Sequence, residues 1–157
     1  MSKLLGLPAW AYAAALSQLD GMTPKKLRIA LLHEDPEEAW ARAICDSAIT
    51  DEAVARICER CEQDNIEVVY IGDPNYPRTL RYDPTPPAVL FYRGSLSALQ
   101  QRRVGIVGTR SPTPSGVYTA REFGEQLAAN EIAVVSGLAR GIDGAVHHGM
   151  KLHYEEV

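Results

Sequence analysis

The stretch from residue 103 to residue 149, RVGIVGTRSPTPSGVYTAREFGEQLAANEIAVVSGLARGIDGAVHHG, decides the fold of this chain. It reads as an apolar strand closed by Gly108, a helix-length segment over about residues 115–130, and a second apolar strand closed by Ser136 and Gly137. Strand, helix and strand at this spacing predict a βαβ unit with parallel strands and a right-handed crossover. Both strands then end at the edge where open α/β sheets bind ligands.

The loops that follow these strands have the composition of a phosphate-binding site. Small residues let backbone N–H groups approach an anion, and a helix N-terminus adds partial positive charge. Arginine side chains fork onto phosphate oxygens, and hydroxyl groups supply further donors. The predicted phosphate-binding residues are therefore Gly108, Thr109, Arg110, Thr113, Ser136, Gly137, Arg140 and Gly141.

Asp143 and His147 lie four residues apart at the start of the next predicted helix, so they share a face. One interpretation is an acid–base pair of a hydrolase. The other is structural support, in which Asp143 caps the helix or braces the glycine loop while His147 packs beside it. A carboxylate that points at a phosphate would repel it, which favours the structural interpretation.

The sequence predicts an α/β protein with two domains. Residues 1–64 form a helical domain, and residues 65–157 form an incomplete Rossmann-like domain. Thr23 and Asp35 are the expected N-caps of two of the helices. Strand-like segments at 66–71 and 88–92 are expected to join the sheet of the βαβ unit. The turn at residues 21–26 resembles the hairpin of helix-hairpin-helix modules, so Lys25 and Lys26 are either weak DNA contacts or solvated lysines of a packing module.

Composition limits the remaining possibilities. An apolar fraction of 46% and a charged fraction of 23% are typical of a globular protein. The net charge is −4, but residues 102–150 carry 5 Lys/Arg against 4 Asp/Glu. No membrane span or signal peptide is predicted, so we expect a cytoplasmic protein. Cys58-x-x-Cys61 has no second cysteine pair, and buried thiols are expected there rather than a metal or redox site. We expect neither a metal nor a cofactor.

An ordered set of motifs makes a family resemblance specific. The set comprises Gly72-Asp73-Pro74-x-Tyr76-Pro77, Pro86-Pro87-x-Val89-Leu90-Phe91, Ile106-Val107-Gly108-Thr109-Arg110, Ser136-Gly137-Leu138-Ala139-x-Gly141-Ile142-Asp143 and His147-x-Gly149. Together they resemble the DNA-processing protein A family (DprA, also called Smf). The resemblance extends over about residues 4–149 and is strongest from Gly72 onward.

That resemblance implies a sterile-alpha-motif-like (SAM-like) helical domain followed by an extended Rossmann-like domain. It also implies a bacterial protein without catalytic activity that binds and protects single-stranded DNA in natural transformation. Such proteins dimerise and help to load the recombinase RecA. In the family, the residues matching Gly108, Arg110, Ser136, Gly137 and Gly141 line the groove that holds the strand.

Other functions were weighed against this one. A nucleotide-processing enzyme resembling the lysine decarboxylase-like phosphoribohydrolases would use Arg110 on a nucleotide phosphate, but their Gly-Gly-Gly and Pro-Gly-Gly-x-Gly-Thr runs are missing. A dinucleotide oxidoreductase would need a G-x-G-x-x-G run, and Gly105-x-x-Gly108 does not supply it. An interaction module built on residues 1–64 stays open.

The family's sheet continues beyond the segment matched here, whereas this chain ends within the second predicted helix. We therefore expect a truncated domain with reduced activity, and the family's homodimer is in doubt. Val134 and Val135 would line an exposed sheet edge, which predicts marginal stability or aggregation.

Overall fold

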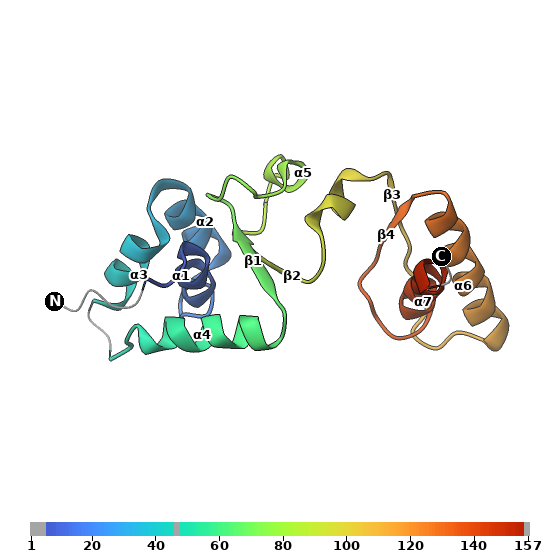
Figure 1. The fold of residues 1–157 in the computed structure, drawn as a ribbon, viewed down its shortest axis with the longest axis horizontal. Coiled ribbons are helices and arrows are strands. Elements are labelled where there is room, and N and C mark those ends of the chain that lie inside the picture. The colour runs from blue at the N-terminus through green and yellow to red at the C-terminus, as the bar shows by residue number, and fades with distance from the viewer. Residues whose placement is uncertain (1–5, 46–47, 156–157) are drawn as a thin grey trace. The chain divides into compact units, whose positions relative to one another are not determined.

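The computed structural model describes residues 6–45 and 48–155, with side chains described up to Lys151. Contacts divide the chain into two compact units, Met1–Ser95 and Leu96–Val157. Figure 1 shows the elements of both, and each unit is described by itself.

The N-terminal unit is built on helices. They are α1 (Ala9–Leu16), α2 (Pro24–His33), α3 (Pro36–Ile44) and α4 (Glu52–Gln63). Helix α1 is buried along most of its length, and its alanines let α3 and α4 pack closely against it. Trp40 of α3 fills the space beside them and donates its indole N–H to Asp51 at 2.9 Å. The helical character predicted for this part of the chain is confirmed.

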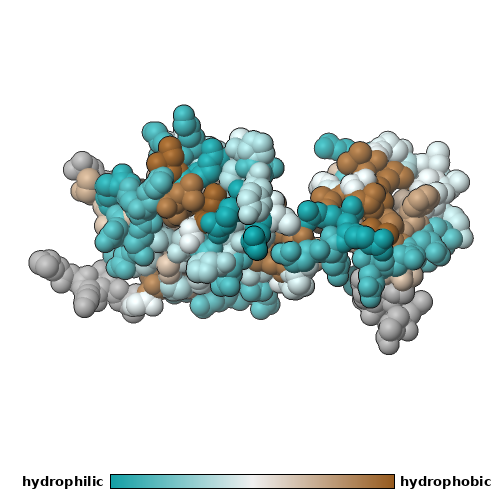
Figure 2. Space-filling model, turned by 90° about the horizontal axis from the view of Figure 1, so that it is seen from above, coloured by the Kyte–Doolittle hydropathy of each residue, from teal (hydrophilic) through white to brown (hydrophobic). Residues whose placement is uncertain are grey.

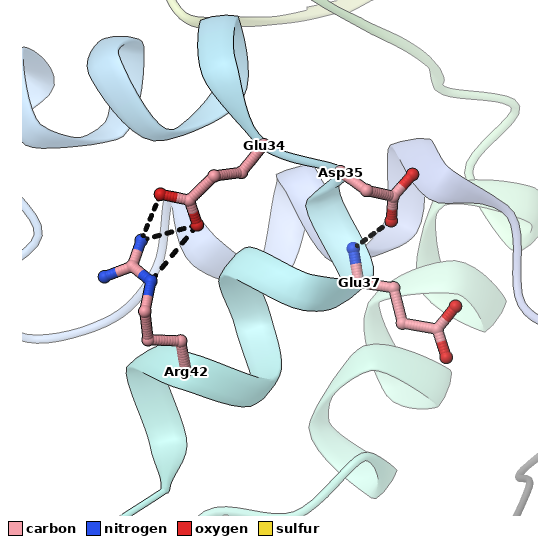
Figure 3. Close-up of polar contacts among 4 residues, drawn as sticks. All are labelled: Glu34, Asp35, Glu37 and Arg42. Carbon is pink, nitrogen blue, oxygen red and sulfur yellow. Dashed lines mark hydrogen bonds and ion pairs between the residues drawn. The ribbon is translucent and has the colours of Figure 1, made fainter.

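Both predicted N-caps are confirmed. The Thr23 hydroxyl oxygen accepts from the amide of Lys26, and Asp35 accepts from the amide of Glu37 at 2.9 Å (Figure 3). Just outside the start of α3, Glu34 forms an ion pair with Arg42 whose shortest N···O distance is 2.8 Å. The turn from α2 into α3 is therefore fixed from both sides.

Strands β1 (Glu67–Tyr70) and β2 (Val89–Tyr92) form an antiparallel pair, with the short helix α5 (Arg78–Arg81) between them. The prediction that these strands join the sheet of the βαβ unit is wrong, because they form a two-stranded sheet of their own. The reason is burial: Val69 and Ile71 are buried, and β1 packs against α1 and α4. The hairpin therefore groups with the helices, and the division falls after Ser95 rather than after residue 64.

The C-terminal unit is the βαβ unit. After a 3₁₀ turn, η1 (Leu96–Gln100), it contains β3 (Arg103–Gly105), α6 (Pro114–Ala129), β4 (Ala133–Val135) and α7 (Ile142–Glu155). Strands β3 and β4 pair in parallel, with Val104 opposite Val134. The α/β class and the parallel pair predicted from the sequence are confirmed.

Helices α6 and α7 touch through their backbones. A Cβ atom at Gly124 would lie 2.1 Å from the carbonyl oxygen of Val146, and one at Gly149 would lie 2.1 Å from that of Arg121. Only glycine permits this separation, so the two helices pack as one block.

Large apolar side chains are exposed in this unit. Figure 2 shows brown, hydrophobic surface on one side of the molecule. The exposed apolar side chains of this unit include Val104, Val107, Val135 and Leu138. Of the two valines expected at an exposed sheet edge, Val135 is 50% exposed, whereas Val134 is half-buried. The marginal stability inferred from such an edge stays a prediction.

Cys58 and Cys61 are buried free thiols, as predicted, and burial is the main cause that raises the pKa of both. Within the described residues, no group of His, Cys, Asp and Glu side chains is arranged to hold a metal ion. The helices of this described part are also too short or too polar to cross a membrane.

Candidate anion-binding site at the strand ends

Two loops leave the same edge of the parallel pair, and the structure brings them into contact. The first loop is residues 106–113, after β3, and the second loop is residues 136–141, after β4. The amide of Ile142 donates to the carbonyl of Thr109 at 3.2 Å. Gly141 has φ +97°, and a Cβ there would lie 2.2 Å from the Thr109 carbonyl oxygen. Glycine is therefore required at this position both for its backbone conformation and for the close approach of the loops.

Asp143 joins the two loops directly. Asp143 is 5% exposed, and each carboxylate oxygen accepts one backbone amide: Oδ1 from Gly108 at 3.1 Å and Oδ2 from Gly137 at 3.1 Å. The composition of the loops predicted that these two amides would face a bound phosphate. In the structure they donate to Asp143 instead, so the two glycines shape the site without offering these donors to a ligand.

Ser136 and His147 form a second contact behind the second loop. Ser136 Oγ lies 2.9 Å from His147 Nε2 and accepts the amide of Leu138 at 3.0 Å. Leu138 adopts φ +51°, and this hydrogen bond helps to hold that left-handed conformation. Asp143 and His147 share a helix turn as predicted, but each binds a different part of the loops.

Several donors stay available at the strand ends. Among the described residues, the amides of Thr109, Arg110, Arg140 and Gly141 donate to no protein acceptor. The side chains of Arg110 and Arg140 are exposed and form no ion pair within the same part of the chain. An anion at this edge would therefore meet two guanidinium groups and unpaired backbone N–H groups.

Thr113 has a structural part in the site. Its side-chain oxygen caps α6 by accepting the amide of Gly116 at 3.1 Å. The N-terminus of α6 thus opens beside the first loop and adds its partial positive charge there.

A groove of about 590 Å³ lies beside the start of α6. Its walls include apolar and hydroxyl-bearing side chains, namely Ile106, Phe123, Val146, Thr113, Ser115 and Thr119. Because these walls carry no charge, the formal positive charge of the site comes from Arg110 and Arg140.

Lys25 and Lys26 lie in the N-terminal unit, outside the unit that carries the loops. The Lys26 ammonium donates to the carbonyl of Gly21 at 3.5 Å, within the turn that precedes α2. Gly21 has φ +76°, which explains the glycine in this turn. Both Lys25 and Lys26 are exposed.

Two features of the site could not be predicted from local sequence patterns. The first is the reach of Asp143, since its bond to Gly108 spans 35 residues and no local pattern marks it. The second is Ile142, because a Cβ at Gly108 would lie 2.6 Å from the Cβ of Ile142. The sequence signals of that contact are a glycine that closes the first strand and an aliphatic residue that opens α7, the helix after the second strand.

Comparison with known proteins gives consistent matches. The chain is 35% identical to Protein Smf of Synechocystis sp. over 158 residues, covering 87% of this chain and 40% of the relative. It is 37% identical to DNA processing protein DprA of Bacillus subtilis over 130 residues, covering 82% of this chain and 40% of that protein. This chain therefore spans about 40% of the length of these relatives.

A solved structure and a family model agree with these relatives. The X-ray structure of DNA processing protein A (DprA) from Streptococcus pneumoniae superposes with a TM-score of 0.54 at 24% identity, covering 95% of this chain and 51% of that chain; this likeness concerns the fold alone. The model of the DNA recombination-mediator protein A family matches residues 67–155, which include the hairpin, both loops and α7. This chain belongs to the DNA recombination-mediator protein A family.

Proposed function

We propose that the two loops bind the phosphate backbone of single-stranded DNA. The observation that carries the proposal is the set of donors at the strand ends. It comprises two exposed arginines and four amides that have no acceptor within the described part of the chain, on loops held together by Asp143. Thr109, Thr113 and Ser136 contribute hydroxyl groups at the same edge. Contacts of this kind recognise phosphate and not base sequence.

The family supports DNA as the anion. The family is that of DNA recombination-mediator protein A, and the Bacillus subtilis relative is a DNA processing protein. On this basis we further propose that the whole protein acts in natural transformation in the cytoplasm, where it protects incoming single strands and helps to load RecA. A homodimer of the family's kind belongs to the same proposal.

We infer that the site binds rather than catalyses. In the usual arrangement of an activated Ser–His nucleophile, a third group orients the histidine. Here the nearby carboxylate of Asp143 is occupied by the amides of Gly108 and Gly137. Ser136 already accepts the amide of Leu138, which is a structural use of its oxygen.

The test is the binding of labelled oligothymidine and of duplex DNA over a series of salt concentrations. We expect the single strand to bind more tightly and its affinity to fall as salt rises. Arg110→Ala should weaken oligothymidine binding about tenfold, because a charge-assisted hydrogen bond to phosphate is lost. Arg121→Ala removes an exposed charge from α6 and serves as the matched control. Salt-insensitive binding, or an unchanged affinity of Arg110→Ala, would overturn the assignment.

The Ser136–His147 contact also defines the test of an enzymatic alternative. Purified protein would be incubated with adenosine monophosphate, and release of the base would be followed by chromatography. Our proposal expects no turnover from the wild-type chain. Turnover that is lost in both Asp143→Asn and His147→Gln, with folding retained, would favour the nucleotide-processing enzyme instead.

A further inference from the structure

A loop of the N-terminal unit carries an aromatic and basic surface to which nothing above assigns a role. This loop, residues 76–87, connects the turn after β1 to the start of β2. We propose that the 76–87 loop is a second contact for single-stranded DNA, in which Tyr82 stacks on a base and Arg78 binds a phosphate. The inference rests on the proposed function, because it takes the same ligand.

The strand-end site lacks one element of single-strand recognition. Proteins that hold single strands combine cationic groups for the backbone with aromatic side chains on which bases stack. The first and second loops, residues 106–113 and 136–141, contain no aromatic residue. A stacking surface therefore has to lie outside these two loops. The exposed aromatic rings outside them include Tyr118 and Phe123 of α6 and Tyr82 of the N-terminal unit, and Tyr82 is the most exposed of these three.

The 76–87 loop is fixed by its own contacts. Tyr76 is 2% exposed, and its hydroxyl donates to the carbonyl of Pro87 at 2.7 Å, which closes the loop at its ends. The Arg81 guanidinium lies 5.4 Å from the centre of the Tyr76 ring and donates to the carbonyl of Asp73 at 3.1 Å. A compact loop with close ends and internal packing needs little further ordering when it binds a ligand.

Tyr82 and Arg78 take no part in these internal contacts. Tyr82 is 77% exposed, and Arg78 is exposed with no partner among the described residues. They lie four residues apart across α5, and Tyr82 keeps a right-handed helical conformation, so both occupy one face. An aromatic ring and a guanidinium on one rigid face match a base and a neighbouring phosphate.

The charge around the loop favours an anion. Arg28 of α2 donates to the carbonyl of Pro86 at 3.5 Å, and Lys25 lies one turn before it on the same helix. The carboxylate of Asp83 accepts the amide of Thr85 at 2.7 Å, so it is directed to the loop's own backbone. Arg28 thus adds a positive charge at the end of the loop that carries Arg78 and Tyr82. A duplex hides the faces of its bases, so the stacking contact selects single strands.

The experiment measures the affinity of the full chain for oligothymidine and for an abasic phosphodiester chain of equal length. We expect Tyr82→Ala to weaken oligothymidine binding about fivefold, the lower end of the effect of losing one stacked base. Tyr82→Phe keeps the ring and should bind as the wild type does. Neither variant should change the affinity for the abasic chain. Arg78→Ala should weaken both ligands, whereas Arg56→Ala, which removes an exposed charge from α4, should weaken neither.

A second readout locates the contact. An oligothymidine that carries 5-iodouracil, irradiated in the complex, should crosslink to the peptide that contains Tyr82. Equal affinity of Tyr82→Ala and Tyr82→Phe, with no crosslink to that peptide, would overturn the inference. The inference would also be overturned if Tyr82→Ala lost as much affinity for the abasic chain as for oligothymidine.

The outcomes also separate this inference from the function on which it rests. If Arg110→Ala weakens binding and the Tyr82 variants do not, the strand-end site stands and the 76–87 loop fails. If only the Tyr82 and Arg78 variants weaken binding, the loop stands and the strand-end assignment fails. Absence of any binding to oligothymidine by the folded wild-type chain would remove both.

Discussion

At the scale of single residues, Asp143 has the largest structural consequence in the C-terminal unit. Asp143→Ala leaves the amides of Gly108 and Gly137 without their acceptor. Because hydrogen bonds to charged groups contribute about 1.5–3 kcal/mol, we expect a loss of about 3 kcal/mol in the free energy of unfolding. Asp143→Asn keeps one acceptor oxygen and should lose about half as much. Urea unfolding followed by circular dichroism measures both, and unchanged midpoints would contradict the bridging role.

Gly141 tests the contact between the loops. Gly141→Ala places a methyl group against the Thr109 carbonyl in a backbone conformation that disfavours it, so we expect about 1–3 kcal/mol of destabilisation. Oligothymidine affinity should fall as the loops separate. The matched control is Gly144→Ala, where φ is not positive and the nearest atom lies at 3.4 Å. If the two variants unfolded at the same urea concentration, the contact between the loops would not explain why residue 141 is a glycine.

The residues of the site show where sequence reasoning stops. Residue types and spacing predicted Arg110, Arg140 and the two glycine-rich loops, since phosphate chemistry requires those groups. The pattern could not show that Asp143 takes the amides of Gly108 and Gly137, because that depends on two loops meeting in space. It therefore placed those amides on the ligand.

At the scale of elements, the contact of α6 with α7 depends on two glycines. Gly124→Ala gains helix propensity of about 1 kcal/mol but drives a methyl group into the Val146 carbonyl. Overpacking outweighs that gain, and we expect a net loss of about 1–2 kcal/mol on urea unfolding. Gln126→Ala, an exposed change on the same helix, should alter stability by less than about 0.5 kcal/mol. A Gly124→Ala protein as stable as the wild type would mean that the helices separate easily.

The elements divide clearly into predicted and unpredicted features. The helices and the βαβ unit could be predicted because their signals are local in the sequence. These signals are the N-caps at Thr23 and Asp35 and the spacing of the apolar residues. The placement of the β1–β2 hairpin was not local. Its strands are apolar enough to join either sheet, and burial of Val69 and Ile71 against the helices decided the matter.

At the scale of the whole molecule, a net charge of −4 means that long-range attraction does not draw DNA to this protein. The affinity for single-stranded DNA must therefore come from a few local phosphate contacts. The salt dependence of the affinity gives their number. For single strands, the slope of log affinity against log salt falls by about 0.7 for each phosphate contact. Arg110→Ala should therefore reduce the magnitude of the slope by about 0.7, while Arg121→Ala should leave it unchanged. Equal slopes for all three proteins would show that Arg110 contacts no phosphate.

The carboxylate of Asp143 also has a kinetic consequence. The amides of Gly108 and Gly137 belong to different loops but share one buried acceptor, so an opening that frees one is expected to free the other. We consider conditions in which the loops close faster than an exposed amide proton exchanges with deuterium. The exchange rates of both amide protons should then give the same free energy of loop opening. Exchange rates of the two glycines, measured by NMR and corrected for intrinsic rates, would then rise together with urea. If one were protected and the other exchanged freely, the loops would open independently, and a ligand bound to one would leave the other unchanged.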